Sequence, residues 1–237
     1  MNNIKIIIKK ELKSYFNSPM AYIFLIIFAI TNGYFFTNTF FLVNQSDMRI
    51  LFNIIPLVYL FFIPAITMSL IAREKNSGTM EVMSTLPIKD SDFILGKFFS
   101  ALLLIVIGLS ITIIHLFTLI NVGTNIDYGS VFTGYLGIIL LGAVYASIGT
   151  FASSVTDNQV ISFIISVFIV LTFFLMDKVI YFIPSSIQGI IQFLSVDFHL
   201  SNMSRGVIDT RNIIYFISLI YFFLSMTARV LEMRKWK

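Results

Sequence analysis

Cysteine is absent from this 237-residue chain, and charged residues make up only 12% of it. Without cysteine the protein can form no disulfide, no thiolate metal site and no cysteine nucleophile. The sequence also lacks the motif G-x-x-x-x-G-K-[ST], with which a P-loop cradles the phosphates of ATP. The chain is therefore neither a disulfide-stapled domain nor a P-loop ATPase in its own right.

Apolar residues dominate what is present. They form 57% of the chain, which includes 26 phenylalanines, and the mean hydropathy is +0.92. Soluble domains carry about 25% charged residues, so this composition indicates an integral membrane protein. The formal charge of +4 does not suggest nucleic-acid binding, because the basic residues gather at the ends of apolar runs, where they orient spans and meet anionic lipid.

Six apolar runs have about the length needed to cross a bilayer. They cover residues 20–43, 49–71, 93–119, 131–153, 160–176 and 212–227. Helices are expected, because an open strand or loop would leave backbone groups unsatisfied in lipid. The sequence thus predicts an all-α integral membrane protein, with residues 1–237 forming a single transmembrane domain and both termini on one side.

The distribution of lysine and arginine predicts the orientation. With cytoplasmic termini, twelve basic residues lie inside: Lys5, Lys9, Lys10, Lys13, Arg73, Lys75, Lys89, Lys97, Arg229, Arg234, Lys235 and Lys237. Four lie outside: Arg49, Lys178, Arg205 and Arg211. By the positive-inside rule the segment 72–92 is cytoplasmic and the loop 177–211 is extracytoplasmic.

Residues 1–19 have the pattern of an interfacial amphipathic helix. The basic residues Lys5, Lys9 and Lys13 repeat every four positions, and the apolar residues Ile4, Ile8 and Leu12 repeat beside them. Such a helix would lie flat on the inner leaflet before the first span. A basic tail that only sets the topology is the alternative.

The charged segment 72–92 lies between two apolar runs, and its sequence predicts a turn followed by a short amphipathic helix. Gly78 allows the backbone to turn, and Pro87 ends the short helix that follows. Four side chains form one edge of this helix at i, i+3, i+4 and i+7: Thr79, Val82, Met83 and Leu86. With Glu81 projecting elsewhere, the helix is suited to dock into a groove of a cytoplasmic partner.

Ionisable residues within the spans are scarce. His115 is essentially the one candidate there, since Arg49 and Lys97 lie near the ends of their runs. In the outer loop His199 has only Asp197 nearby, so neither a metal site nor an acid–base pair is expected. The fourth span has small residues at Gly142 and Ala146, a spacing that permits close helix approach within the subunit or at a dimer interface. Short apolar segments in the loop 177–211 predict re-entrant or interfacial helices before the last span.

Three stretches of the sequence carry a family resemblance. The segment REKNSGTMEVMSTLPIKDSDFILGKFFSA resembles the signature of ABC-2 type transporter permeases. Together with GTFASSVTDNQVISF and SRGVIDTRNIIYF, it is most similar to the permease subunit of the gliding-motility-associated ABC transporter of Bacteroidota. The likeness covers almost the entire chain.

This resemblance implies an amphipathic elbow helix, six spans, a coupling helix between spans two and three, and short re-entrant helices before span six. The residues that match the family's ATPase-coupling motif are Glu74, Gly78, Thr79, Glu81 and Pro87, closed by Gly96 and Lys97. Met80 and Met83 stand where Ile or Leu is usual, which conserves volume on a docking face.

The resemblance also implies partners and a function. A separate cytoplasmic P-loop subunit would bind ATP and magnesium, so this chain would hold no cofactor and would not itself be an enzyme. A second permease copy or a related permease would complete a path in a bacterial inner membrane for export or membrane remodelling. The alternative is a non-transporting anchor, or an assembly or signalling protein, for a cytoplasmic ATPase. The cargo is open in both interpretations.

Overall fold

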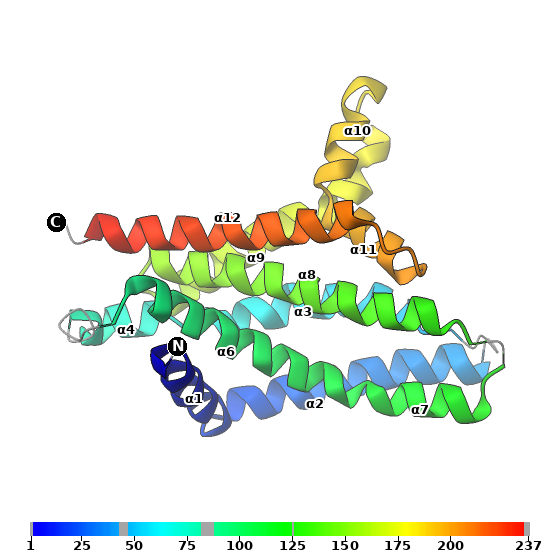
Figure 1. The fold of residues 1–237 in the computed structure, drawn as a ribbon, viewed down its shortest axis with the longest axis horizontal. Coiled ribbons are helices and arrows are strands. Elements are labelled where there is room, and N and C mark those ends of the chain that lie inside the picture. The colour runs from blue at the N-terminus through cyan, green and yellow to red at the C-terminus, as the bar shows by residue number, and fades with distance from the viewer. Residues whose placement is uncertain (1, 43–46, 82–87, 125, 235–237) are drawn as a thin grey trace.

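A computed structural model of the chain describes residues 2–42, 47–81, 88–124 and 126–234. All regular secondary structure within these ranges is helical (Figure 1). Most of the helices run side by side as a bundle, as Figure 1 shows. The expected all-α class is confirmed.

The helices follow the apolar runs of the sequence closely. In chain order they are α1 (Asn2–Phe16), α2 (Pro19–Thr37) with a π-helical end η1 (Asn38–Leu42), α3 (Arg49–Thr67), α4 (Ala72–Asn76), α6 (Asp90–Ile111), α7 (Ile113–Val122), α8 (Tyr128–Val155), α9 (Gln159–Val179), the 3₁₀ turn η2 (Ile180–Phe182), α10 (Ser185–Leu194), α11 (Val196–Ser204) and α12 (Thr210–Arg234).

Six helical stretches of the described residues are long and apolar enough to cross a membrane, so the six predicted spans are confirmed. They are Pro19–Leu42, Arg49–Asn76, Asp90–Val122, Tyr128–Val155, Gln159–Val179 and Thr210–Met233. The third is broken between α6 and α7, where the Thr112 hydroxyl donates to the Leu109 carbonyl at 2.7 Å. A hydroxyl that bonds back to the preceding turn bends a helix.

The bundle has two distinct ends. Helix α1, helix α4 and the last turns of α12 lie at one end, here called the terminal end (Figure 1). The start of α8 and the end of α7 lie at the other, here called the far end. Near the far end α10 projects sideways from the bundle, almost perpendicular to the spans. The loop 177–211 therefore contains the two short helices that were expected, α10 and α11.

Helix α8 forms the centre of the bundle. It is the most buried span and packs against α3, α6, α9, α11 and α12. Small residues make this possible: a Cβ on Gly142 would lie 3.0 Å from Ile105 of α6 and 3.3 Å from Tyr59 of α3, and Ala146 is fully buried. Both positions of the predicted packing motif therefore face helices of this same chain.

Candidate functional site: the base of the segment between α3 and α6

The charged segment leaves the bundle at the terminal end. After α4, Gly78 adopts φ of 68°, a left-handed conformation that glycine reaches without steric cost. Residues 79–81 are helical again, with Met80 buried and Thr79 and Glu81 exposed. The other predicted residues of this short helix lie outside the described residues: Val82, Met83 and Leu86 of its docking edge, and Pro87 at its end.

A single hydroxyl of α8 holds the junction between α3 and α4. The Ser153 oxygen accepts hydrogen bonds from the backbone N–H groups of Ile71 and Ala72, each at 2.9 Å, and donates to the Met68 carbonyl at 2.9 Å. One hydroxyl offers one donor and two acceptor sites, so Ser153 is saturated by this junction. Lys75 adds a hydrogen bond to the Ser154 carbonyl. The root of the segment is thereby tied to the central helix.

Four charged side chains meet beside this junction. Lys97 of α6 is fully buried, and its Nζ lies 2.8 Å from Glu74 Oε1 and 3.0 Å from Glu11 Oε1. Lys10 reaches the same Glu74 oxygen at 3.0 Å from a more exposed position. We call Glu11, Glu74, Lys97 and Lys10 the buried charge cluster. Its two carboxylates and two ammonium groups sum to zero charge.

The buried charge cluster joins three elements that are distant in sequence. Glu11 and Lys10 come from α1, Glu74 from α4 and Lys97 from α6. Removing one partner of a buried ion pair leaves an uncompensated charge, which is strongly destabilising. The three elements are therefore held in one arrangement as long as the charges remain paired.

Helix α1 is seated on the bundle by two further contacts. A Cβ on Gly96 would lie 2.7 Å from Ile7, so the absence of a side chain lets α1 approach α6 closely. The Tyr15 hydroxyl donates to the Ile66 carbonyl of α3 at 3.1 Å. Burial, reinforced by the nearby Glu11 carboxylate, raises the pKa of Tyr15 well above its usual value, so this phenol stays protonated and keeps donating.

The structure gives the two predicted lines of interfacial residues on α1 different exposures. Lys5, Lys9 and Lys13 are exposed, and the apolar residues of the predicted stripe are half-buried: Ile4, Ile8 and Leu12. The line that faces the bundle runs through Ile7, Glu11 and Tyr15, which are all buried.

Of the predicted coupling residues that the structure describes, three lie at the base of the segment and three lie just beyond α4. Glu74, Gly96 and Lys97 contact α1 or each other. Gly78, Thr79 and Glu81 lie on the exposed part of the segment. Sequence reasoning missed Glu11. The sequence did contain a hint of its role: Glu11 is an acidic residue in a basic helix, and it shares a helix face with Ile7 and Tyr15, each four residues away.

The remaining histidines do not form an acid–base site. The His115 ring stacks on Phe36 of α2, with centroids 4.6 Å apart. Asp197 pairs with Lys178 at 2.7 Å, whereas His199 bonds to Phe193 and Asn212. Asp197 and His199 of the outer loop therefore have different partners and do not pair with each other.

The fold and the site define a multi-pass α-helical membrane protein in which α4, at the base of a charged segment, is anchored to the bundle at the terminal end. A family model described as "ABC-2 family transporter protein" matches residues 5–234. The chain thus belongs to the ABC-2 transporter family, whose members are the membrane subunits of ABC transporters and work with an ATP-binding subunit. No curated protein matches the chain.

Proposed function

We propose that this chain is a permease subunit that couples ATP hydrolysis by a separate cytoplasmic subunit to export or membrane remodelling. The coupling element is the segment between α3 and α6, and the terminal end of the bundle is cytoplasmic. Two permease subunits, identical or related, enclose the path. ATP and magnesium bind to the partner, and the catalytic residues belong to that partner.

The observation that carries this proposal is the buried charge cluster. A docking element transmits force only if its base moves together with the spans. Lys97 lies inside α6 and holds Glu74 at 2.8 Å, and Ser153 of α8 bonds the two residues that lead into α4. If docking displaces the residues that follow Gly78, α1, α6 and α8 move with them as rigid bodies. A simple connecting loop needs no such anchorage.

The exposed residues that follow Gly78 supply the contact with the ATP-binding subunit. Glu81 is exposed in the helical turn that follows Gly78. We expect Glu81→Arg to release the ATP-binding subunit, because charge reversal at a docking surface places like charges against each other or leaves a partner charge unpaired. The tagged chain is purified in mild detergent, and co-purifying proteins are identified by mass spectrometry.

A matched control for this experiment is Glu232→Arg. Glu232 is an exposed glutamate on α12 at the same end of the bundle. The proposal requires that a P-loop ATPase co-purifies with the native chain and with Glu232→Arg, and that Glu81→Arg loses it. Equal retention in both variants would exclude Glu81 from the docking surface.

The orientation is testable because the chain has no native cysteine. Asn76 and Ser186 are both exposed, one beside the segment at the terminal end and the other in α10. A membrane-impermeant maleimide is expected to label Ser186→Cys in spheroplasts, in which the outer membrane has been opened and the inner membrane is intact. It should label Asn76→Cys only after the membrane is permeabilised. The reverse pattern would invert the topology.

The likeness to the gliding-motility permease of Bacteroidota narrows the proposal to an inner-membrane transporter linked to that process. A non-transporting anchor for the ATPase would share the docking surface. The two functions differ in one observable, since a transporter shows ATPase activity that rises with cargo. Reconstituted complexes in which candidate amphiphiles leave the ATPase rate unchanged would favour the anchor.

A further inference from the structure

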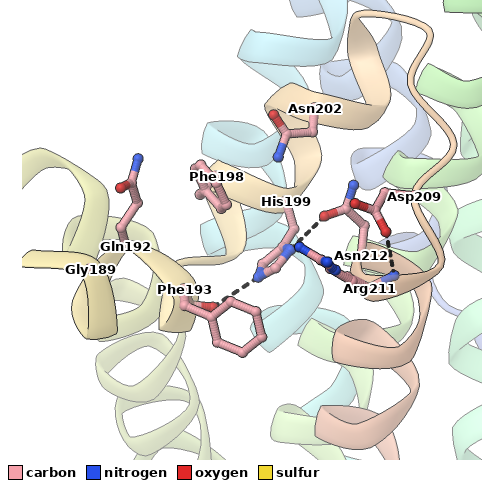
Figure 2. Close-up of a pocket in the computed structure, with 9 residues that line it drawn as sticks. All are labelled: Gly189, Gln192, Phe193, Phe198, His199, Asn202, Asp209, Arg211 and Asn212. Carbon is pink, nitrogen blue, oxygen red and sulfur yellow. Dashed lines mark hydrogen bonds between the residues drawn. The ribbon is translucent and has the colours of Figure 1, made fainter.

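A pocket of about 270 Å³ lies near the far end, between α10, α11 and the start of α12 (Figure 2). It is the pocket that Figure 2 draws, and it is separate from the coupling segment. Two phenylalanine rings contribute to its wall, and six polar side chains line the rest: Gln192, His199, Asn202, Asp209, Arg211 and Asn212. Its volume is sufficient for a phosphate-sized group.

His199 lies in this pocket with both ring nitrogens engaged. The residue is 1% exposed. Its Nε2 atom lies 2.8 Å from the Phe193 carbonyl at the end of α10, as the dashed line in Figure 2 shows. A carbonyl oxygen only accepts hydrogen bonds, so Nε2 must carry a hydrogen.

The second nitrogen decides the charge of the ring. Nδ1 lies 2.7 Å from Asn212 Oδ1, which is also an acceptor. In this arrangement both nitrogens donate, and the ring is an imidazolium. A neutral ring with its hydrogen on Nε2 has a lone pair on Nδ1, so the Asn212 amide must turn its NH₂ group toward it. The protonation state of His199 thus decides whether Asn212 turns its oxygen or its NH₂ group toward the ring.

In the imidazolium state the pocket has donors without acceptors. Asn212 is 3% exposed, and its Nδ2 has no hydrogen-bond partner within the described residues. Within the same ranges the exposed Arg211 guanidinium forms no ion pair. The Asn212 NH₂ group is buried, and a buried donor without a partner is costly. An anion with several oxygens would offset that cost.

The net charge of the pocket depends on whether the His199 ring is protonated. Asp209 and Arg211 contribute one charge of each sign, and Asp209 Oδ1 accepts the Arg211 backbone N–H at 2.8 Å. On α11 itself Asp197 is paired with Lys178 of α9, which also lies 3.8 Å from Asp177. From α12 Tyr215 stacks on the ring, with the two ring centroids 3.9 Å apart. The pocket is therefore neutral with a neutral ring and carries +1 with the imidazolium.

We propose that this pocket is an oxyanion site that takes up a proton together with its ligand. The ligand is a phosphate-type oxyanion, held by the Arg211 guanidinium and by the field of the His199 imidazolium. Protonation adds a positive charge and turns the Asn212 NH₂ group away from the ring, so it favours the anion. By linkage, anion binding favours protonation to the same extent.

The affinity for sulfate at two pH values tests the proposal. Sulfate keeps its charge between about pH 5.5 and about pH 8, the range in which histidine changes charge. Calorimetry on the full chain in a non-ionic detergent, with chloride balancing the ionic strength, is expected to give at least about tenfold tighter binding at the lower pH. A second arm uses dihexanoyl-phosphatidylglycerol, whose phosphodiester charge is also constant. Tighter binding of this lipid identifies a headgroup site, and binding of sulfate alone identifies a free-anion site.

Three variants separate the site from unspecific effects. His199→Gln keeps a donor toward Phe193 but cannot become charged, so its affinity should not depend on pH. Arg211→Gln changes an exposed side chain and should weaken binding at both pH values. His115→Gln changes the only other histidine and should behave like the native chain. Sulfate affinity that is equal at both pH values, or pH dependence that survives in His199→Gln, would overturn the proposal, and so would absence of binding to both probes.

Discussion

Lys97→Met is expected to lower the Tm of the protein by about 10 °C. Lys97 is fully buried and lies within 3.0 Å of two carboxylates. Methionine fills the same space without charge, so Glu11 and Glu74 stay buried and, among the described residues, keep an ion pair only with the exposed Lys10. Breaking a buried pair in this way costs about 3–5 kcal/mol, and one kcal/mol corresponds to about 2–4 °C in a chain of this size. Thermal unfolding in detergent measures the loss.

Two further variants show whether charge is the cause. The triple variant Glu11→Gln, Glu74→Gln and Lys97→Met removes the three buried charges of the cluster together. We expect it to recover most of the Tm, because uncharged replacements of a buried ion cluster are often well tolerated. Lys89→Met removes an exposed lysine just before α6 and should change the Tm little. A Tm of Lys97→Met close to that of Lys89→Met would mean that the cluster does not hold α1, α4 and α6 together.

Gly149→Ala is expected to have the second large effect. An added Cβ would lie 1.9 Å from Thr67 Oγ1 and 2.6 Å from Thr67 Cβ, where α8 crosses α3 just before the coupling segment. Thr67 cannot easily turn away, because its hydroxyl donates to the Ile63 carbonyl at 2.8 Å. Forced overpacking of this kind costs about 1–3 kcal/mol. We expect a lower Tm and a weaker dependence of the partner's ATPase rate on the permease.

The matched control is Gly189→Ala, because a Cβ on Gly189 in α10 would meet nothing within 4 Å. Alanine favours a helix over glycine by about 1 kcal/mol, so this variant should be neutral or slightly stabilised. Adding Thr67→Ala to Gly149→Ala removes the nearest atom and should restore part of the Tm. Full stability of Gly149→Ala alone would show that α3 and α8 can separate without loss.

Hydrophobic length and charge patterning were sufficient to predict the spans. The apolar runs are as long as a bilayer requires, so all six were found, although the last helix continues to Arg234 and the third breaks at Thr112. At the break the Thr112 hydroxyl bonds to the preceding turn, and the hydropathy pattern contains no signal for such a break. The orientation from twelve against four basic residues remains a prediction.

The base of the coupling segment could be predicted only in part. The motif located Glu74, Gly96 and Lys97, because these residues lie in one continuous stretch. Glu11, the second carboxylate paired with Lys97, lies 86 positions from it in the chain. Periodicity within α1 showed which residues share a helix face, but it could not show that this face meets α6.

By itself, the sequence determined that the protein is a membrane-spanning helical bundle with a polar segment between its second and third spans, because bilayer thickness and backbone hydrogen bonding leave a long apolar run few alternatives. Only the tertiary structure decided which charges are paired and buried. It placed Lys97 between carboxylates of α1 and α4, and it placed His199 between acceptors of α10 and α12. These contacts depend on the packing of whole helices, and a side chain's partner across a packed interface is not encoded in its own neighbourhood in the sequence.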